Sequence, residues 1–175
     1  MEEYIKEINE RIQNPIENIN SIKGFEIISE SLVYKVYDLF GRNSLLSILY
    51  QIGVFPGTQI AERLKREYNR EEFEIMEALV ILMEELKDYY SIQIKDIQQS
   101  EDKVKIIIEN HCFLRTPISH REKLNYGKSF CRTNKGYFET AFKILLGNKI
   151  KKIEINFLNN DAEKDVCVEE LIFYK

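Results

Sequence analysis

The spacing of apolar residues predicts helices in the N-terminal half of the chain. In the first segment, four apolar residues recur every three or four positions: Tyr4, Ile5, Ile8 and Ile12. This spacing places them on one face of an amphipathic helix over residues 2–14, which the Asn14-Pro15 pair ends. A short isolated helix is marginal in water, so its apolar face needs a packing partner. Residues 25–29 then indicate a short strand.

Glycines divide the apolar stretches that follow. Gly41 splits the apolar run over residues 33–52 into two segments, and the GVFPG sequence over residues 53–57 is typical of a turn. Thr58 is a residue type that caps helix N-termini, so we expect a new helix to begin there. Apolar residues at helical spacing predict a further helix over about residues 71–88.

The period of the pattern changes near residue 90, where apolar and polar residues begin to alternate. Alternation over residues 92–108, interrupted by a polar turn, predicts a β-hairpin. A helix over about residues 135–146, closed by Gly147, separates this hairpin from two more strands over residues 149–157 and 166–174. Strands clustered in hairpins form antiparallel sheets.

These elements predict an α+β fold. A helical N-terminal half packs on a small antiparallel β-sheet of about four or five strands, with one helix between the two C-terminal hairpins. We expect residues 1–24 to form an N-terminal amphipathic helix and linker, and residues 25–175 to form one α+β domain. Hydrophobic residues make up 44% of the chain, which is enough for a core and too much for a disordered protein.

The charge distribution argues against nucleic acid and membrane partners. The net charge is −4, and most basic residues stand beside acidic ones; a more basic stretch over residues 115–135 is typical of a solvated loop. No stretch approaches the ~20 apolar residues of a membrane-spanning helix. The N-terminus is acidic, whereas a signal peptide begins with basic residues. We therefore expect a cytoplasmic protein.

The chain lacks the sequence motifs of common enzyme classes. GxxxxGK[ST], GxGxxG, HExxH and GxSxG are all absent, so the sequence offers no nucleotide or flavin motif. A cysteine nucleophile could be drawn from Cys112 or Cys131 with His111 or His120, but the local sequence does not support it. The sequence favours a binding protein over an enzyme.

Aromatic residues cluster around the glycine-containing segments. Tyr50, Phe55, Tyr137 and Phe138 are the candidates for lining an apolar pocket between the helices of residues 45–86 and the sheet. We expect no charged residue at the base of this pocket. The alternative is that each of these rings belongs to the ordinary core.

Two cysteines and one acidic residue form the candidate metal site. Cys131, Glu154 and Cys167 lie on three elements that a sheet could bring together, and thiolates and carboxylates are ligands of zinc. The alternative is that the three cysteines of the chain are small core residues, since free cysteine is among the most buried residue types.

Four segments resemble the 4-vinyl-reductase, or hydrocarbon-binding, family: NHCFLRTPIS from residue 110, KSFCRTNKGYFETAFKILLG from 128, KKIEINF from 151 and DVCVEELIFY from 165. The family pattern is a Cys before a Gly-led helix, a strand with Glu-x-x-Cys, and a final strand with Cys-x-Phe. Cys131, Glu154 and Cys167 match it, whereas Phe157 stands where the family has the second Cys.

The resemblance implies a function and a site. The family includes sensor domains of phenol- and xylene-responsive transcription activators, and it is related in fold to TRAPP transport-particle subunits. It implies a pocket for a small apolar or aromatic ligand and, in many members, a homodimer. It also implies a structural zinc on Cys131, Glu154 and Cys167, with a fourth ligand from Asn160, Asp161, His120, Cys112 or water; the alternative is a lost metal whose place Phe157 fills.

The resulting hypothesis is a sensor-type domain that binds a small apolar molecule. Two alternatives stay open, an enzyme or enzyme accessory of the vinyl-reductase kind and a TRAPP-like structural adaptor. A closed cavity favours the binding domain, a redox cofactor favours the enzyme, and a solid core favours the adaptor.

Overall fold

The computed structural model describes residues 2–13, 21–114, 130–161 and 163–175. The chain forms two compact units, Met1–Leu39 and Phe40–Lys175.

The first unit contains α1 (Glu2–Gln13) and the beginning of α2 (Ser21–Glu67). The amphipathic helix expected over residues 2–14 is confirmed, and its apolar side chains Tyr4, Ile5 and Ile8 are 63%, 50% and 39% exposed. The strand expected over residues 25–29 is wrong, because this segment is helical and belongs to α2. Its apolar residues were too few to distinguish a strand from one helical turn.

The break expected at Gly41 is confirmed. Gly41 has φ 75° and ψ 174°, which is not helical, so α2 consists of one helical segment before this residue and one after it. A positive φ of this size strains residues with a Cβ, and glycine adopts it without cost.

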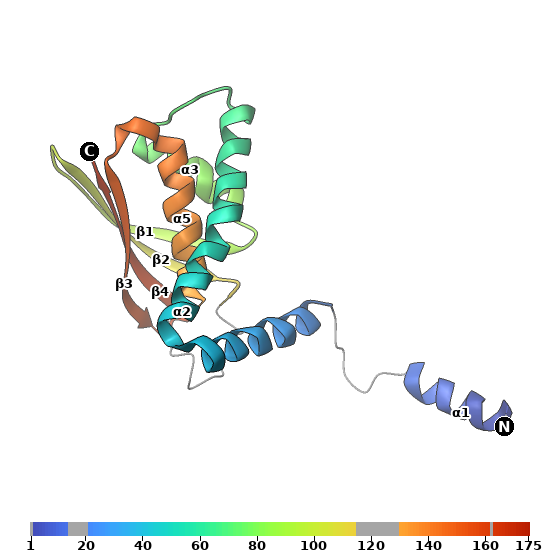
Figure 1. Cartoon of the computed structure of the whole chain (residues 1–175). Coiled ribbons are helices and arrows are strands. Elements are labelled where there is room, and N and C mark those ends of the chain that lie inside the picture. Colours follow the sequence, from blue (N-terminus) through green and yellow to red (C-terminus); the bar gives the residue numbers. More distant parts are fainter. Residues whose placement is uncertain (1, 14–20, 115–129, 162) are drawn as a thin grey trace. The chain divides into compact units, whose positions relative to one another are not determined.

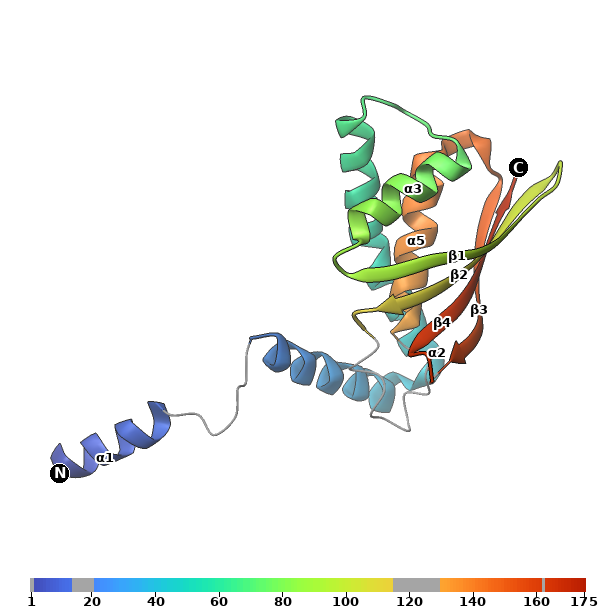
Figure 2. The ribbon, with the colours of Figure 1, turned by 180° about the vertical axis from the view of Figure 1, so that it is seen from behind.

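The second unit contains the rest of α2, α3 (Ile75–Leu86), α5 (Cys131–Leu146), the short 3-10 helix η1 (Gly147–Lys149) and four strands: β1 (Tyr90–Gln99), β2 (Lys103–Cys112), β3 (Lys152–Asp161) and β4 (Val166–Tyr174). The sheet is antiparallel throughout with the order β1-β2-β4-β3. Figures 1 and 2 show α5 between the sheet and the second segment of α2. The expected α+β fold, with one helix between two hairpins, is confirmed.

The alternating strands direct one set of side chains into the core. Along β2 and β4, every second residue is buried over most of the strand, as period-2 patterning requires. The core lies between this face of the sheet and the helices α3 and α5. Its largest fully buried side chains are Phe73, Phe142, Phe173, Leu79, Leu82, Ile106, Ile108, Leu145, Leu146, Ile155, Leu171 and Asn110.

Residues 53–57 form a helix–helix contact, and the turn expected there is wrong. The GVFPG sequence lies inside α2, where its two glycines, one turn apart, face α5. A Cβ added at Gly53 would lie 2.0 Å from the carbonyl oxygen of Thr133, and one at Gly136 would lie 2.1 Å from that of Tyr50. The glycines therefore let two helix backbones approach, and they do not reverse the chain.

Thr58 also lies within α2, so the helix start expected at this residue is wrong. Its hydroxyl donates to the carbonyl oxygen of Val54 at 3.0 Å, a bond that a helical threonine makes to the preceding turn. Across the described residues, no helix is both long and apolar enough to cross a membrane.

Candidate functional site

An open cavity of about 600 Å³ lies at the surface of the second unit. Three helices, the turn after α3, the start of β1 and the residue after β2 line it. The lining residues are Phe55, Pro56, Gln59, Ile60, Arg63 and Arg66 from α2; Glu85 and Leu86 from α3; Tyr89 from the turn; Tyr90 from β1; Phe113; and Thr133, Asn134 and Tyr137 from α5. The α2 residues recur at helical spacing and so share one face of that helix. The close approach of α2 to α5 at Gly53 and Gly57 lies next to this lining.

Aromatic rings form most of the apolar wall. The ring of Phe113 packs edge-on against Tyr89 and Tyr90, with centroid distances of 6.2 and 5.7 Å. Tyr90 in turn packs edge-on against Phe138, which belongs to the core. Edge-to-face pairs of this kind are favourable and hold the rings in defined positions. The wall is therefore apolar and built on packed side chains.

Two tyrosine hydroxyls at the cavity stay protonated over the physiological pH range. Burial raises the pKa of Tyr90, whose hydroxyl donates to Asn134 Oδ1 at 2.9 Å. Burial and the charge of Glu85 also raise the pKa of Tyr137. Both side chains thus act as neutral hydrogen-bonding groups within an apolar wall.

The structure places two of the four expected pocket residues on the cavity. Phe55 and Tyr137 line it, Phe138 lies behind Tyr90 in the core, and Tyr50 lies elsewhere on α2. Three charged side chains also line the cavity: Arg63, Arg66 and Glu85. The sequence contained a signal for the α2 lining, since Phe55, Gln59 and Arg63 share a helical face once residues 53–57 are taken as helix.

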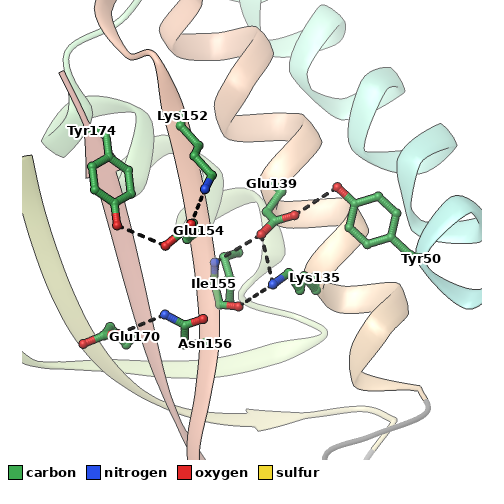
Figure 3. A network of polar contacts seen from close by, with 9 residues as sticks. All are labelled: Tyr50, Lys135, Glu139, Lys152, Glu154, Ile155, Asn156, Glu170 and Tyr174. Carbon is green, nitrogen blue, oxygen red and sulfur yellow. Dashed lines mark hydrogen bonds and ion pairs between the residues drawn. The ribbon is translucent and has the colours of Figure 1, made fainter. Parts of the chain in front are cut away.

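Tyr50 belongs to a polar network on the other side of α5. Its hydroxyl donates to Glu139 Oε2 at 2.9 Å, and burial followed by this bond raises the pKa of Tyr50 to about 12. Glu139 Oε1 accepts from the backbone N–H of Ile155 at 3.1 Å, and Lys135 donates to the Ile155 carbonyl oxygen at 2.8 Å (Figure 3). The α5 side chains thus form hydrogen bonds with backbone groups on the unpaired edge of β3, which is an edge strand of the sheet.

The three cysteines gather at the N-terminal end of α5. Cys131 and Cys167 are hydrogen-bonded to each other through their thiols, and this bond with burial raises the pKa of Cys131. Burial raises the pKa of Cys112 to about 11, and Asn134 bonds to its thiol. All three are buried. The two expected thiol ligands therefore do lie side by side, as protonated thiols at neutral pH.

Glu154 does not join them. It lies on the opposite face of the sheet, where it pairs with Lys152 and accepts from the Tyr174 hydroxyl at 3.0 Å (Figure 3). Among the residues that the structure describes, no three His, Cys, Asp or Glu side chains are placed to hold a metal ion. His120, one of the expected fourth ligands, lies outside the described residues.

A buried carboxyl group lies close to the cysteines and was not expected from the sequence. Glu169 is 3% exposed, and burial raises its pKa to about 7 although Asn110 Nδ2 donates to it at 3.2 Å. Asn110 is itself buried, and its Oδ1 has no hydrogen-bond partner among the described residues. The inner face of the sheet is therefore polar at this end.

The fold resembles proteins of known structure at low sequence identity. No protein-family model and no curated protein sequence matches the chain. A trafficking protein particle complex subunit 3 from Naegleria fowleri, covalently bound to palmitic acid, superimposes with a TM-score of 0.60 at 12% identity over 86% of this chain and 93% of that one. The phenol-responsive sensory domain of the transcription activator PoxR, with phenol, superimposes with a TM-score of 0.52 at 12% identity over 85% and 74%.

These neighbours confirm the expected relation in fold to TRAPP subunits and to a phenol-responsive sensory domain. Membership of the 4-vinyl-reductase family stays a prediction from the sequence segments.

Proposed function

We propose that the second unit is a sensor-type binding domain whose ligand is a small apolar or aromatic molecule held in the cavity beside α2. The cavity of about 600 Å³ carries this proposal, because ligand sites typically have volumes of roughly 300–1,000 Å³ and walls of apolar and aromatic side chains. Structural neighbours that hold phenol and palmitic acid support it.

Burial supplies the binding free energy in this proposal. Each Å² of apolar ligand surface removed from water contributes about 25 cal/mol before the cost of ordering. The hydroxyl groups of Tyr90 and Tyr137 remain protonated, so they present neutral dipoles to the ligand. This arrangement selects for neutral apolar surface along most of the cavity.

Titration calorimetry with two neutral probes, phenol and 1-decanol, tests the proposal. Phe55 is 71% exposed, so Phe55→Ala leaves the fold intact while it removes part of the cavity wall. We expect this variant to weaken 1-decanol binding about three- to tenfold. Phe40→Ala is the matched control, because Phe40 is 62% exposed and does not line the cavity. If the wild-type protein binds neither phenol nor 1-decanol, the proposed function is contradicted.

We further propose that the protein is a homodimer in which the exposed face of α1 contacts a second copy. Three large apolar side chains of α1 are exposed, and burying such a face is what makes a short helix stable. Ile5→Asp with Ile8→Asp should lower the mass in sedimentation from dimer to monomer. Leu158→Asp is the control, since Leu158 is also exposed but lies on β3. An unchanged mass of the α1 variant removes this helix from the interface.

A further inference from the structure

One wall of the cavity changes from apolar to cationic along α2. The lining residues of this helix run from Phe55 and Pro56 through Ile60 to Arg63 and Arg66. At a rise of 1.5 Å per residue, the distance from Phe55 to Arg66 is about 16 Å along the helix axis. An elongated molecule lying along α2 would therefore meet aromatic and aliphatic side chains at one end and guanidinium groups at the other.

The two arginines at the cationic end differ in their partners. Arg63 pairs with Glu85 across the cavity and with Glu67 at 3.3 Å on its own helix, so the Glu85 carboxylate already has a cationic partner. Arg66 makes no ion pair with any residue that the structure describes. Arg63 thus shares two carboxylates, whereas Arg66 is the lining cation that has no carboxylate partner among the described residues.

Arg66 is also exposed, which keeps a bound head group in contact with water. An anion next to Arg66 would gain a charge-assisted hydrogen bond without full desolvation, while an attached chain would lie against the aromatic wall. A single unpaired guanidinium matches a singly charged head group such as a carboxylate.

We propose that the ligand of this cavity is an elongated amphiphile with a carboxylate head, whose head pairs with Arg66 and whose apolar chain extends along α2 toward Phe55. This inference rests on the proposed function and adds to it the ligand's charge and its direction in the cavity. The guanidinium group offers the carboxylate two parallel N–H donors, and the ion pair at the rim weakens with salt because it is solvent-accessible.

Two probes of equal chain length, decanoate and 1-decanol, separate the head group from the chain. Titrations use the full chain at pH 8 and low ionic strength. Arg66→Gln should lower the affinity for decanoate about three- to tenfold and leave the affinity for 1-decanol unchanged. Arg66→Lys keeps the positive charge, so it should weaken decanoate binding less than Arg66→Gln does. Raising the salt concentration should weaken binding of decanoate alone.

Arg42→Gln is the matched control, because Arg42 is an exposed arginine of the same helix that does not line the cavity. This variant should bind both probes as the wild type does. If both probes bind and Arg66→Gln changes neither affinity, or changes both equally, the carboxylate-head inference is overturned and the proposed function stands. If neither probe binds to the wild-type protein, the proposed function fails and the inference fails with it.

Discussion

Helix α5 makes two interfaces of opposite construction. On the sheet side, large apolar side chains fill the space; Phe142 and Phe173 are fully buried and pack edge-on at a centroid distance of 5.2 Å. On the α2 side, Gly53, Gly57 and Gly136 let the two helix backbones meet directly, with no room for a Cβ at these positions. The sheet-side interface is therefore vulnerable to removing atoms, and the α2-side interface is vulnerable to adding them.

The difference matters for the cavity because its lining begins at the α2-side interface. Phe55 and Pro56 lie between the two glycines of α2, and Thr133 and Tyr137 flank Gly136 on α5. A small separation of the two helices would move both walls of the cavity. A loss of volume on the sheet side would lower stability without moving the α2 wall directly.

The largest effect is expected from opening the sheet-side interface. Phe142→Ala removes a fully buried ring and leaves a cavity, which should lower the free energy of unfolding by about 3–5 kcal/mol. Urea denaturation followed by circular dichroism measures this loss. Phe40→Ala, at a side chain that is 62% exposed, should change stability by less than about 0.5 kcal/mol. Equal losses in the two variants would contradict the assignment of Phe142 to the core.

A second effect is expected at Glu169, at the polar end of the sheet-side interface, where a substitution should raise stability instead of lowering it. The pKa of Glu169 is raised from 4.5 to about 7, so the folded protein holds a proton that the unfolded chain has lost between these pH values. Stability should therefore fall as pH rises from about 4.5 to 7 and then level off, by about 3 kcal/mol in all.

Glu169→Gln removes this titration. The variant should show no such fall and should be more stable than the wild type above pH 7, because a neutral amide is easier to bury than a carboxylate. Denaturation at pH 5 and pH 8 measures both effects. Glu163→Gln, at an exposed carboxyl, should retain the wild-type slope. If Glu169→Gln loses stability between pH 5 and pH 8 as the wild type does, a group other than Glu169 causes the fall.

An intermediate effect is expected from adding one methyl group to the α2-side interface. The Cβ of Gly136→Ala would lie 2.1 Å from the Tyr50 carbonyl oxygen, so the helices must separate, at a cost of about 1–3 kcal/mol. Binding of 1-decanol should also weaken. Gly24→Ala is the matched helical control; nothing lies within 4 Å of its Cβ, so it should stabilise slightly or have no effect. Thermal unfolding of both variants distinguishes close packing from helix propensity.

The smallest effect is expected from the polar contact on the α2-side interface. Tyr50→Phe removes the hydroxyl that donates to Glu139 and should cost about 1 kcal/mol. Glu139 retains its bonds to Lys135 and to the Ile155 backbone, so the edge of β3 should remain covered. Chemical denaturation measures the loss, and a loss above that of Gly136→Ala would reverse the order proposed for this interface.

Local patterns in the sequence predicted the sheet well. Alternation of apolar and polar residues located both hairpins, and it placed Glu154 on the face opposite Ile153 and Ile155, as the structure shows. The same alternation explains why Glu154 and Cys167 are not neighbours, since Cys167 points to the buried face. Grouping them rested on the elements that carry them and on the family pattern, and neither specifies the face on which each side chain lies.

The sequence by itself determined the secondary structure of the second half, because hydrophobic periodicity is a local property that burial of one face enforces. It did not determine the role of Gly53 and Gly57, since glycine permits both a turn and a close helix contact. Only the tertiary structure, by setting α5 against α2, decided between them. The cavity depended on the same choice: Phe55, Arg63 and Arg66 share a lining because residues 53–57 continue a helix instead of ending one.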